Sequence, residues 1–219
     1  LVCLLHEKPF DGVNGSGKHN NWSFCTEEGE NILEPGDSPK DNIRFLTVLA
    51  AIIKGVDEYQ DLLRISVASA GNDHRLGADE APPAIISIYL GEELTAILEA
   101  IEAGNEYVDT IDRRLELGIS TLPPIAKDST DRNRTSPYAF YQFWLNGNKF
   151  EFRMLGSNLN ISCPNTILNT IVAEELTQFA DELECVKKED MTKALIALIQ
   201  KTLKNHKRII FSGNGYSED

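Results

Sequence analysis

The hairpin signal within residues 138–155 constrains the fold of this chain more than any other feature of its sequence. An aromatic run at 138–145 is followed by Asn146-Gly147 and by a run at 149–155 in which charged and apolar residues alternate. An Asn-Gly pair between two β-prone runs is the strongest short-range indication of a β-hairpin. Successive side chains of a strand point to opposite faces, so the second strand has a charged face and an apolar face. The charged face holds Lys149, Glu151 and Arg153, and the apolar face holds Phe150, Phe152 and Met154.

A second alternating segment lies at residues 19–26, after a loop with three glycines at 11–17. One face holds His19, Asn21 and Ser23, and the other holds Asn20, Trp22 and Phe24. The loop resembles the phosphate-binding pattern G-x-x-x-x-G-K-[ST], but His19 stands where a hydroxyl must reach the magnesium. A strand also follows it where a P-loop needs a helix. We therefore disfavour a P-loop.

The remaining pattern predicts helices and short strands in one α+β domain. Apolar residues recur at helical spacing from a start at Ser38-Pro39 to about residue 63 or beyond, and over 92–103, 166–183 and 190–203. Gly104 is placed to end the second of these helices. Apolar and β-branched runs predict strands at 1–5 and 84–90.

Acidic residues dominate the charge of the chain. Among 219 residues, 34 Asp and Glu face 21 Lys and Arg, and the formal net charge is −13. We therefore expect no binding to nucleic acid or to an anionic membrane face. No apolar run is long enough to cross a membrane. The four cysteines form no CxxC pair, so we expect them to be small buried hydrophobes in a reducing compartment.

Two polar clusters on the predicted strands could carry chemistry, and each has an ordinary alternative. Lys149, Glu151 and Arg153 could hold a metal and anionic groups, as an ATP-dependent ligase requires. They could equally form the charge ladder of an exposed edge strand. His19 could be a ligand, or it could be satisfied by a backbone carbonyl.

Two loops add further candidates. One carries Arg75, Asp79 and Glu80 just before a predicted strand, where loops often reach over a site. The alternative for that loop is a solvated acidic turn. The other, residues 131–134, holds two arginines that could clamp a phosphate or lie on the surface.

Motifs at these same positions resemble glutamine synthetases, in particular those of type III. In the family's order and approximate spacing they are KPF at 8–10, NGSGKHNNWS at 14–23, AGNDHRLG at 70–77, DEAPP at 79–83, DRNRTSP at 131–137 and NKFEFR at 148–153. The resemblance runs from Leu1 nearly to Tyr216. It implies that ATP phosphorylates the side-chain carboxylate of glutamate and that ammonia then displaces the phosphate, with Mg²⁺ or Mn²⁺ as cofactor.

The resemblance also implies an architecture. We expect an α+β fold in which a curved sheet, backed by helices, forms part of the family's catalytic barrel. Residues 1–219 would be a partial catalytic domain. The N-terminal domain, the first part of the catalytic domain and the C-terminal extension would lie outside this chain, which we interpret as a fragment. The intact protein would be a cytoplasmic homo-oligomer, assembled as a ring.

Roles follow from the resemblance residue by residue, beginning with ATP and its metal. His19 and Glu151 look like ligands of the metal that bridges the ATP phosphates. Asn21, Ser23 and Lys149 look like nucleotide contacts. Two ligands are too few for a hard cation that prefers about six oxygen-rich positions. We therefore expect the 219-residue chain to be inactive by itself.

The substrate-binding roles fall on four other positions. Asn14 and Gly15 look like the segment that holds glutamate, and Arg75 and Arg153 look like clamps on its carboxylates.

The catalytic roles fall on Arg134 and Glu80. Arg134 looks like the cation near the transferred phosphate, and Glu80 looks like the mobile acid that takes a proton from ammonium. The chain departs from type I enzymes at Asn21, where they have a second His, and at Lys149, where they have Arg. Residues 141–145 look inserted relative to the family.

Two rival functions remain open. A related γ-glutamyl ligase would use another amine in place of ammonia. A non-catalytic assembly domain derived from this fold would be expected to lack His19, Glu151 or Arg153, and this chain keeps all three.

Overall fold

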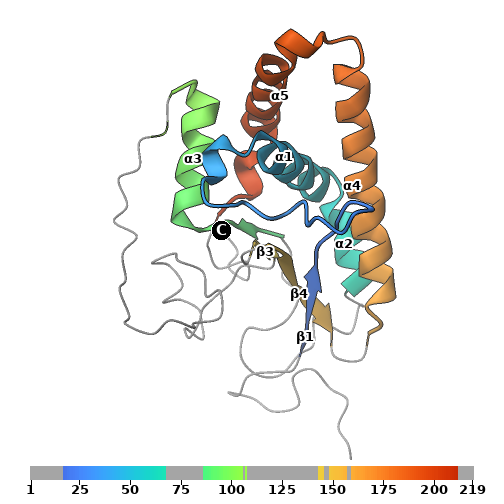
Figure 1. The fold of residues 1–219 in the computed structure, drawn as a ribbon. Helices are drawn as coiled ribbons and strands as arrows, with labels where there is room; N and C mark the ends of the chain where they lie inside the picture. Colours follow the sequence, from blue (N-terminus) through green and yellow to red (C-terminus); the bar gives the residue numbers. More distant parts are fainter. Residues whose placement is uncertain are drawn as a thin grey trace, which may run out of the picture.

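The computed structural model of the chain describes residues 17–67, 86–105, 107, 143–145, 148–156 and 159–211. Helices make up most of these residues, and a small sheet lies on one side of them (Figure 1). The α-helices are α1 (Ile43–Glu58), α2 (Gln60–Val67), α3 (Gly91–Ala103), α4 (Ser162–Leu183) and α5 (Met191–His206). The strands are β1 (Gly17–Trp22), β2 (Ile88–Tyr89), β3 (Phe143–Leu145) and β4 (Phe150–Gly156). Helices with a mainly antiparallel sheet confirm the α+β class at this coarse level.

The four described strands form one open sheet in the order β1-β4-β3-β2. β4 runs antiparallel to both of its neighbours, and β2 runs parallel to β3. The expected curved barrel sheet is not formed by these strands, which lie side by side with β1 and β2 at the two edges.

The predicted hairpin is confirmed by the pairing of its two strands. Leu145 pairs with Phe150, and the antiparallel register continues along β3 and β4. Asn146 and Gly147, the expected tip, lie outside the described residues. The apolar face of the hairpin is buried, since Leu145, Phe150 and Phe152 are each at most 5% exposed.

The strict alternation predicted for β4 ends at a bulge. The β1–β4 register shifts by one residue between Lys18 and Asn20, so that His19 lies opposite two residues of β4, 153–154. An extra residue on one strand shifts the phase of its faces. Leu155 is buried, as are Phe150 and Phe152. The side chains of residues 153 and 154 lie outside the described part of the structure, so the faces assigned to Arg153 and Met154 stay predictions.

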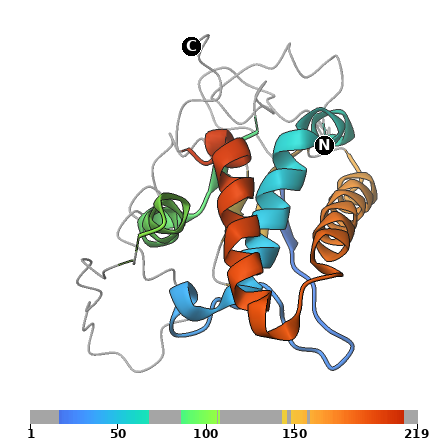
Figure 2. The ribbon, with the colours of Figure 1, turned by 90° about the horizontal axis from the view of Figure 1, so that it is seen from above.

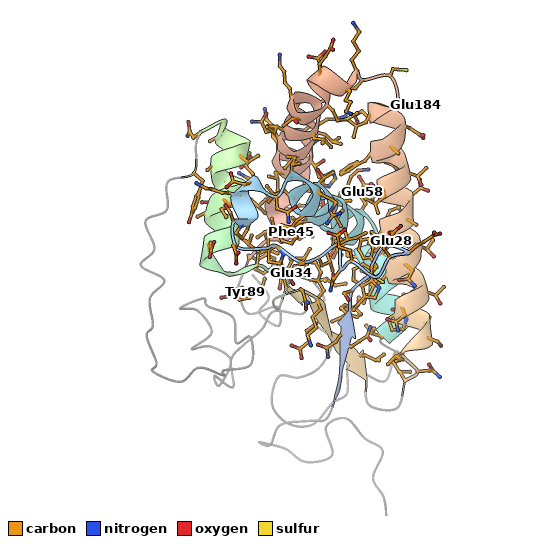
Figure 3. All side chains as sticks on the ribbon, viewed as in Figure 1. Glu28, Glu34, Phe45, Glu58, Tyr89 and Glu184 are labelled. Atoms are coloured by element: carbon orange, nitrogen blue, oxygen red, sulfur yellow. The ribbon has the colours of Figure 1, made fainter. Side chains whose placement is uncertain are left out.

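The helices form a layer in which α1 is central. Seen from above, α3, α5, α1 and α4 lie in that order (Figure 2), and α1 contacts both α4 and α5. Because α1 has neighbours on several sides, every residue from Val48 to Ile53 in this helix is buried. Phe45 lies in the interior of the molecule (Figure 3) and is fully buried. A helix covered on all sides explains why apolar residues occupy nearly every position there.

The long helix predicted from Ser38 differs at both ends. Pro39–Asp41 forms a 3-10 turn, and α1 begins only at residue 43. Its cap is Asn42, whose side-chain oxygen accepts a hydrogen bond from the Phe45 N–H at 3.1 Å. The helix then breaks at Tyr59, and α2 continues from residue 60.

The other predicted helices are confirmed within four residues at each end as α3, α4 and α5. Gly104 ends α3 with a φ of 71°, the left-handed conformation that glycine adopts without a Cβ clash. The strand predicted at 84–90 is shorter, because β2 covers Ile88–Tyr89, and residues 84–85 lie outside the described part of the chain. The strand predicted at 1–5 also lies outside it. After α5, Ile210 pairs with Ile88 at the edge of the sheet.

The prediction that the cysteines are buried was wrong for the three that the structure describes. Cys25, Cys163 and Cys185 are all exposed free thiols. Cys25 lies at an isolated β-bridge, Cys163 at the start of α4 and Cys185 just after its end, and these positions leave them outside the core. Cys3 lies outside the described residues.

Buried charges join the helices of the layer. The Lys54 ammonium of α1 pairs with Glu175 of α4, whose side chain is completely buried, and it also donates to the Gln178 side-chain oxygen at 2.5 Å. Burial raises the pKa of the Glu175 carboxyl, and Lys54 opposes that shift. The second carboxylate oxygen of Glu175 has no hydrogen-bond partner among the described residues. The contacts of the Glu175 carboxylate therefore offset only part of the cost of burying its charge.

Asp57 makes a second buried link. Its carboxylate lies 2.9 Å from the His206 Nδ1 and accepts a hydrogen bond from the Arg208 Nε at 2.7 Å. The Asp57 carboxylate raises the pKa of the Arg208 guanidinium. The end of α5 is thus fastened to α1.

We predict that Glu175→Gln in the intact protein changes how stability depends on pH. A carboxyl whose pKa is raised by folding binds its proton more tightly in the native state, so it stabilises the fold at acidic pH. That contribution is lost as pH rises through the raised pKa, with a slope of up to about 1.4 kcal/mol per pH unit. Glutamine does not titrate, so this part of the decline should disappear from the free energy of unfolding.

Urea denaturation of both proteins between pH 4 and pH 8 measures the effect. Glu184→Gln, at an exposed position just after α4 (Figure 3), is the matched control and should retain the wild-type profile. Parallel profiles for wild type and Glu175→Gln would contradict the assignment.

Candidate functional site

One face of the β1–β4 pair collects the polar residues that the sequence singled out. Asn21 and Ser23 are exposed, and Lys149 and Glu151 are half-buried. Asn20 and Trp22, which alternate with them along the chain, are buried. Because side chains alternate across a strand, the polar set occupies the face turned away from the core. We call this the open face.

The strand register brings two of these residues together. Asn21 of β1 pairs directly with Glu151 of β4, and Trp144 of β3 pairs with Glu151 from the other side. Directly opposed residues in an antiparallel pair share a face, with Cβ atoms about 4.5–5.5 Å apart. An amide and a carboxylate 130 residues apart in the sequence are therefore neighbours.

His19 is placed by the backbone alone. It lies in β1 two residues before Asn21, opposite the bulge at 153–154. Alternation in the two strands predicts that Lys149, Glu151 and Arg153 face His19. The side chains of His19 and Arg153 lie outside the described part of the structure, so this stays a prediction. The same holds for Asn14, Gly15, Arg75, Glu80 and Arg134, which all lie outside the described residues.

Two side-chain hydrogen bonds anchor β1 from its buried side. The Asn20 amide donates to the Asn165 side-chain oxygen at 2.6 Å, and the Trp22 indole N–H donates to the Asn169 side-chain oxygen at 2.8 Å. Both acceptors lie on α4, so the helix layer and the strand that carries Asn21 are tied together. The sequence analysis did not predict these two hydrogen bonds, although the spacing of Asn165 and Asn169 on one predicted helix was a possible signal.

The loop after β1 is held at two further points. The Asn31 side-chain amide donates to the Asn148 carbonyl oxygen at 2.9 Å, just before Lys149. Arg44 of α1 donates to the Glu30 carboxylate at 3.0 Å and lowers its pKa. This exposed ion pair adds little stability. Together the two contacts join the loop after β1 to the start of β4 and to α1.

The donor set on the open face is incomplete for a metal within the described residues. Glu151 offers carboxylate oxygens, which hard cations such as Mg²⁺ and Mn²⁺ prefer. Among the residues that the structure describes, no three His, Cys, Asp or Glu side chains gather in one place. Further ligands would have to come from elsewhere.

A hollow between α3 and the end of α5 lies apart from the open face. Leu98, Leu203 and Ile210 line it, Lys207 and Glu102 pair at 2.6 Å beside it, and its volume is about 50 Å³. Ligand pockets for molecules of drug size measure about 300–1,000 Å³, so this hollow is too small for a nucleotide. None of the described helices combines the length and apolar character that a membrane span requires.

The chain matches known glutamine synthetases along its whole length. It is 53% identical to a type-3 glutamine synthetase of Dictyostelium discoideum, covering 100% of this chain and 29% of that protein. It is 46% identical to glutamine synthetases of Bacteroides fragilis and Butyrivibrio fibrisolvens, covering 100% of this chain and 30% of each. The family described as "Glutamine synthetase C-terminal domain" matches residues 194–219, which begin within α5. The chain thus spans less than a third of the length of these relatives.

We predict that cysteines at positions 21 and 151 form a disulfide, because directly opposed residues come close to the Cβ separation of about 3.5–4.5 Å that a disulfide needs. The test uses Asn21→Cys with Glu151→Cys in the intact protein, with the native cysteines replaced by serine. After mild oxidation, mass spectrometry of unreduced peptides should find the cross-link. Asn20→Cys with Glu151→Cys is the matched control, since those positions lie on opposite faces, and preferential cross-linking of this control would contradict the register.

Proposed function

Because the chain is similar over its whole length to glutamine synthetases, one of them of type 3, we propose that it supplies part of the catalytic domain of an enzyme that joins ammonia to glutamate. ATP would activate the glutamate side chain as γ-glutamyl phosphate, and ammonia would displace the phosphate to give glutamine. The protein would thereby serve nitrogen metabolism and glutamine biosynthesis. The curved-barrel architecture and the partial-domain assignment of residues 1–219 belong to the same proposal.

The observation that carries the proposal is the pairing of Asn21 with Glu151 on the open face. The two motifs that hold these residues, at 14–23 and 148–153, are far apart in the sequence. The fold places Asn21 and Glu151 on adjacent strands, on the face turned away from the core. A site for ATP and metal requires that convergence.

Glu151 fits the role of a metal ligand. Its side chain is half-buried on the open face, and its oxygens suit Mg²⁺ or Mn²⁺. We propose His19, in the neighbouring strand, as a second ligand, with the remaining ligands outside the described residues. A bound metal of this kind would neutralise charge on the ATP phosphates.

The chain's other residues would bind and orient the substrates. Asn21, Ser23 and Lys149 would contact the nucleotide, and Lys149 brings a positive charge beside the phosphates. Asn14 and Gly15 would hold glutamate through short side chains and close backbone approach.

Arginines and one acid would complete the site. Arg75 and Arg153 would clamp the glutamate carboxylates with paired N–H donors. Arg134 would stabilise the negative charge of the transferring phosphoryl group. Glu80 would accept a proton from ammonium, which has no lone pair until it is deprotonated.

The intact enzyme would be a cytoplasmic homo-oligomer arranged as a ring. Assays of product formation and phosphate release distinguish the two rival functions. A γ-glutamyl ligase for another amine would form little glutamine from ammonia and more product with an organic amine. A non-catalytic assembly domain would release no phosphate from ATP with any amine.

We predict that Glu151→Ala and Arg153→Ala, made separately in the intact protein, each lower glutamine formation by at least about a hundredfold. The first removes a metal ligand and the second removes a carboxylate clamp, so each takes away electrostatic stabilisation of the transition state. Glutamine formation and phosphate release are measured with ammonium saturating. Glu27→Ala, at an exposed position of the loop after β1, is the control and should keep wild-type activity. Activity near wild type in Glu151→Ala would refute the proposed site.

We predict that Glu80→Ala separates binding from chemistry. Loss of a proton acceptor should slow the attack by ammonia about a hundredfold while leaving the affinities for glutamate and ATP nearly unchanged. Isothermal titration with each substrate measures binding, and glutamine formation at several ammonium concentrations measures the chemical step. Wild-type turnover in this variant would exclude the role of Glu80.

A further inference from the structure

Two asparagines on α4 accept side-chain hydrogen bonds from alternate residues of β1. Asn165 accepts from the Asn20 amide at 2.6 Å, and Asn169 accepts from the Trp22 indole N–H at 2.8 Å. We call Asn165 and Asn169 the asparagine pair. They are four positions apart on the helix, and their partners are two positions apart on the strand.

The spacing of the two contacts matches the geometry of both elements. Four helical residues rise about 6 Å, and two strand residues rise about 6.6 Å. The helix and the strand can therefore run beside each other and repeat the same contact once. A slip of β1 by one residue would break both hydrogen bonds together and turn its polar residues towards the core.

The asparagine pair stands out against apolar packing. The buried side chains of α4 next to it include Leu168, Ile171 and Val172. Asn20 is 7% exposed, so its amide needs a partner inside the protein. The indole N–H of Trp22 can only donate, and the side-chain oxygen of Asn169 is its acceptor.

β1 has a particular need for such anchoring. In the described sheet it is an edge strand, with a partner on one side only. Its ladder to β4 is interrupted opposite His19, where the register shifts. Backbone pairing alone therefore leaves the rotation of β1 weakly defined at the point where the candidate ligands lie.

We infer that the asparagine pair positions the nucleotide- and metal-binding residues of β1. Holding Asn20 and Trp22 on the buried side sets the orientation of Asn21 and Ser23 on the open face, and of His19 beside them. Asn165 and Asn169 are positioning residues, since they would act through their contacts with β1. The inference rests on the proposed function, because it assigns ATP and its metal to the open face.

The experiment compares four forms of the intact protein. Asn165→Leu with Asn169→Leu removes both acceptors at similar side-chain volume. Asn165→Asp with Asn169→Asp keeps both acceptors. Ile171→Val trims a buried side chain of the same helix without touching the hydrogen bonds, and wild type is the reference. For each form we would measure the melting temperature, kcat, the KM for ATP and the Mn²⁺ concentration that gives half-maximal activity.

The leucine variant should raise the KM for ATP and the half-maximal Mn²⁺ concentration about three- to tenfold, the effect of losing one or two hydrogen bonds. The aspartate variant should stay within about twofold of wild type in both. Ile171→Val should lower the melting temperature with both constants unchanged. Should the leucine pair fail to fold, Asn169→Leu alone carries the same test with a smaller rise.

A leucine variant that loses melting temperature but keeps the wild-type KM for ATP and Mn²⁺ response would overturn the inference, because the pair would then be structural only. Loss of activity in the aspartate variant equal to that in the leucine variant would also overturn it. If wild type itself forms no glutamine, the proposed function fails and the inference falls with it. The wild-type assay thus separates the two failures.

Discussion

The pairing of β1 with β4 is the contact on which the rest of the structure depends. It joins segments about 130 residues apart and gives the sheet two unlike faces. On one face Trp22, Phe150 and Phe152 close the core beneath the helices. On the other, Asn21 and Glu151 are held opposite each other. Burial of large aromatic side chains is a strong driving force, whereas polar cross-strand contacts are weak. The apolar face therefore fixes the register, and the polar face inherits its arrangement.

The helix layer supports this pair through polar links as well as through packing. Asn165 reaches the strand directly, and buried charges such as Lys54 with Glu175 hold α1 to α4. Charges are costly to bury, and the raised pKa of Glu175 reflects that cost. Hydrogen bonds and ion pairs are directional, unlike apolar contacts, so they define how the layers are aligned. The position of the open face thus depends on residues on the opposite, helix-covered side of the sheet.

Local patterns in the sequence were sufficient to predict the structure of a segment where one short-range interaction dominates. The pairing of β3 with β4, the end of α3 at Gly104 and the alternation of buried and exposed residues over 20–23 all follow from short-range rules, and each is confirmed. The start of α1 was placed four residues early because Ser38-Pro39 and Asn42 are both acceptable starts. Ser38-Pro39 begins the 3-10 turn, and the Asn42 cap begins α1. The bulge opposite His19 could not be predicted, because a register shift belongs to two strands at once. Cys25, Cys163 and Cys185 were expected inside, but their exposure depends on where the chain turns.

By itself the sequence determined the class of secondary structure, the residues that could carry chemistry and the resemblance to glutamine synthetases, since these depend on residue type and spacing. The tertiary structure decided which candidates meet. It placed Asn21 beside Glu151 and revealed that Asn165 and Asn169 hold β1 from behind. The physical reason is that alternation along one strand is a local property of the backbone, whereas register and support arise from contacts between segments far apart in the chain. Those contacts are chosen jointly, by the burial of one shared core.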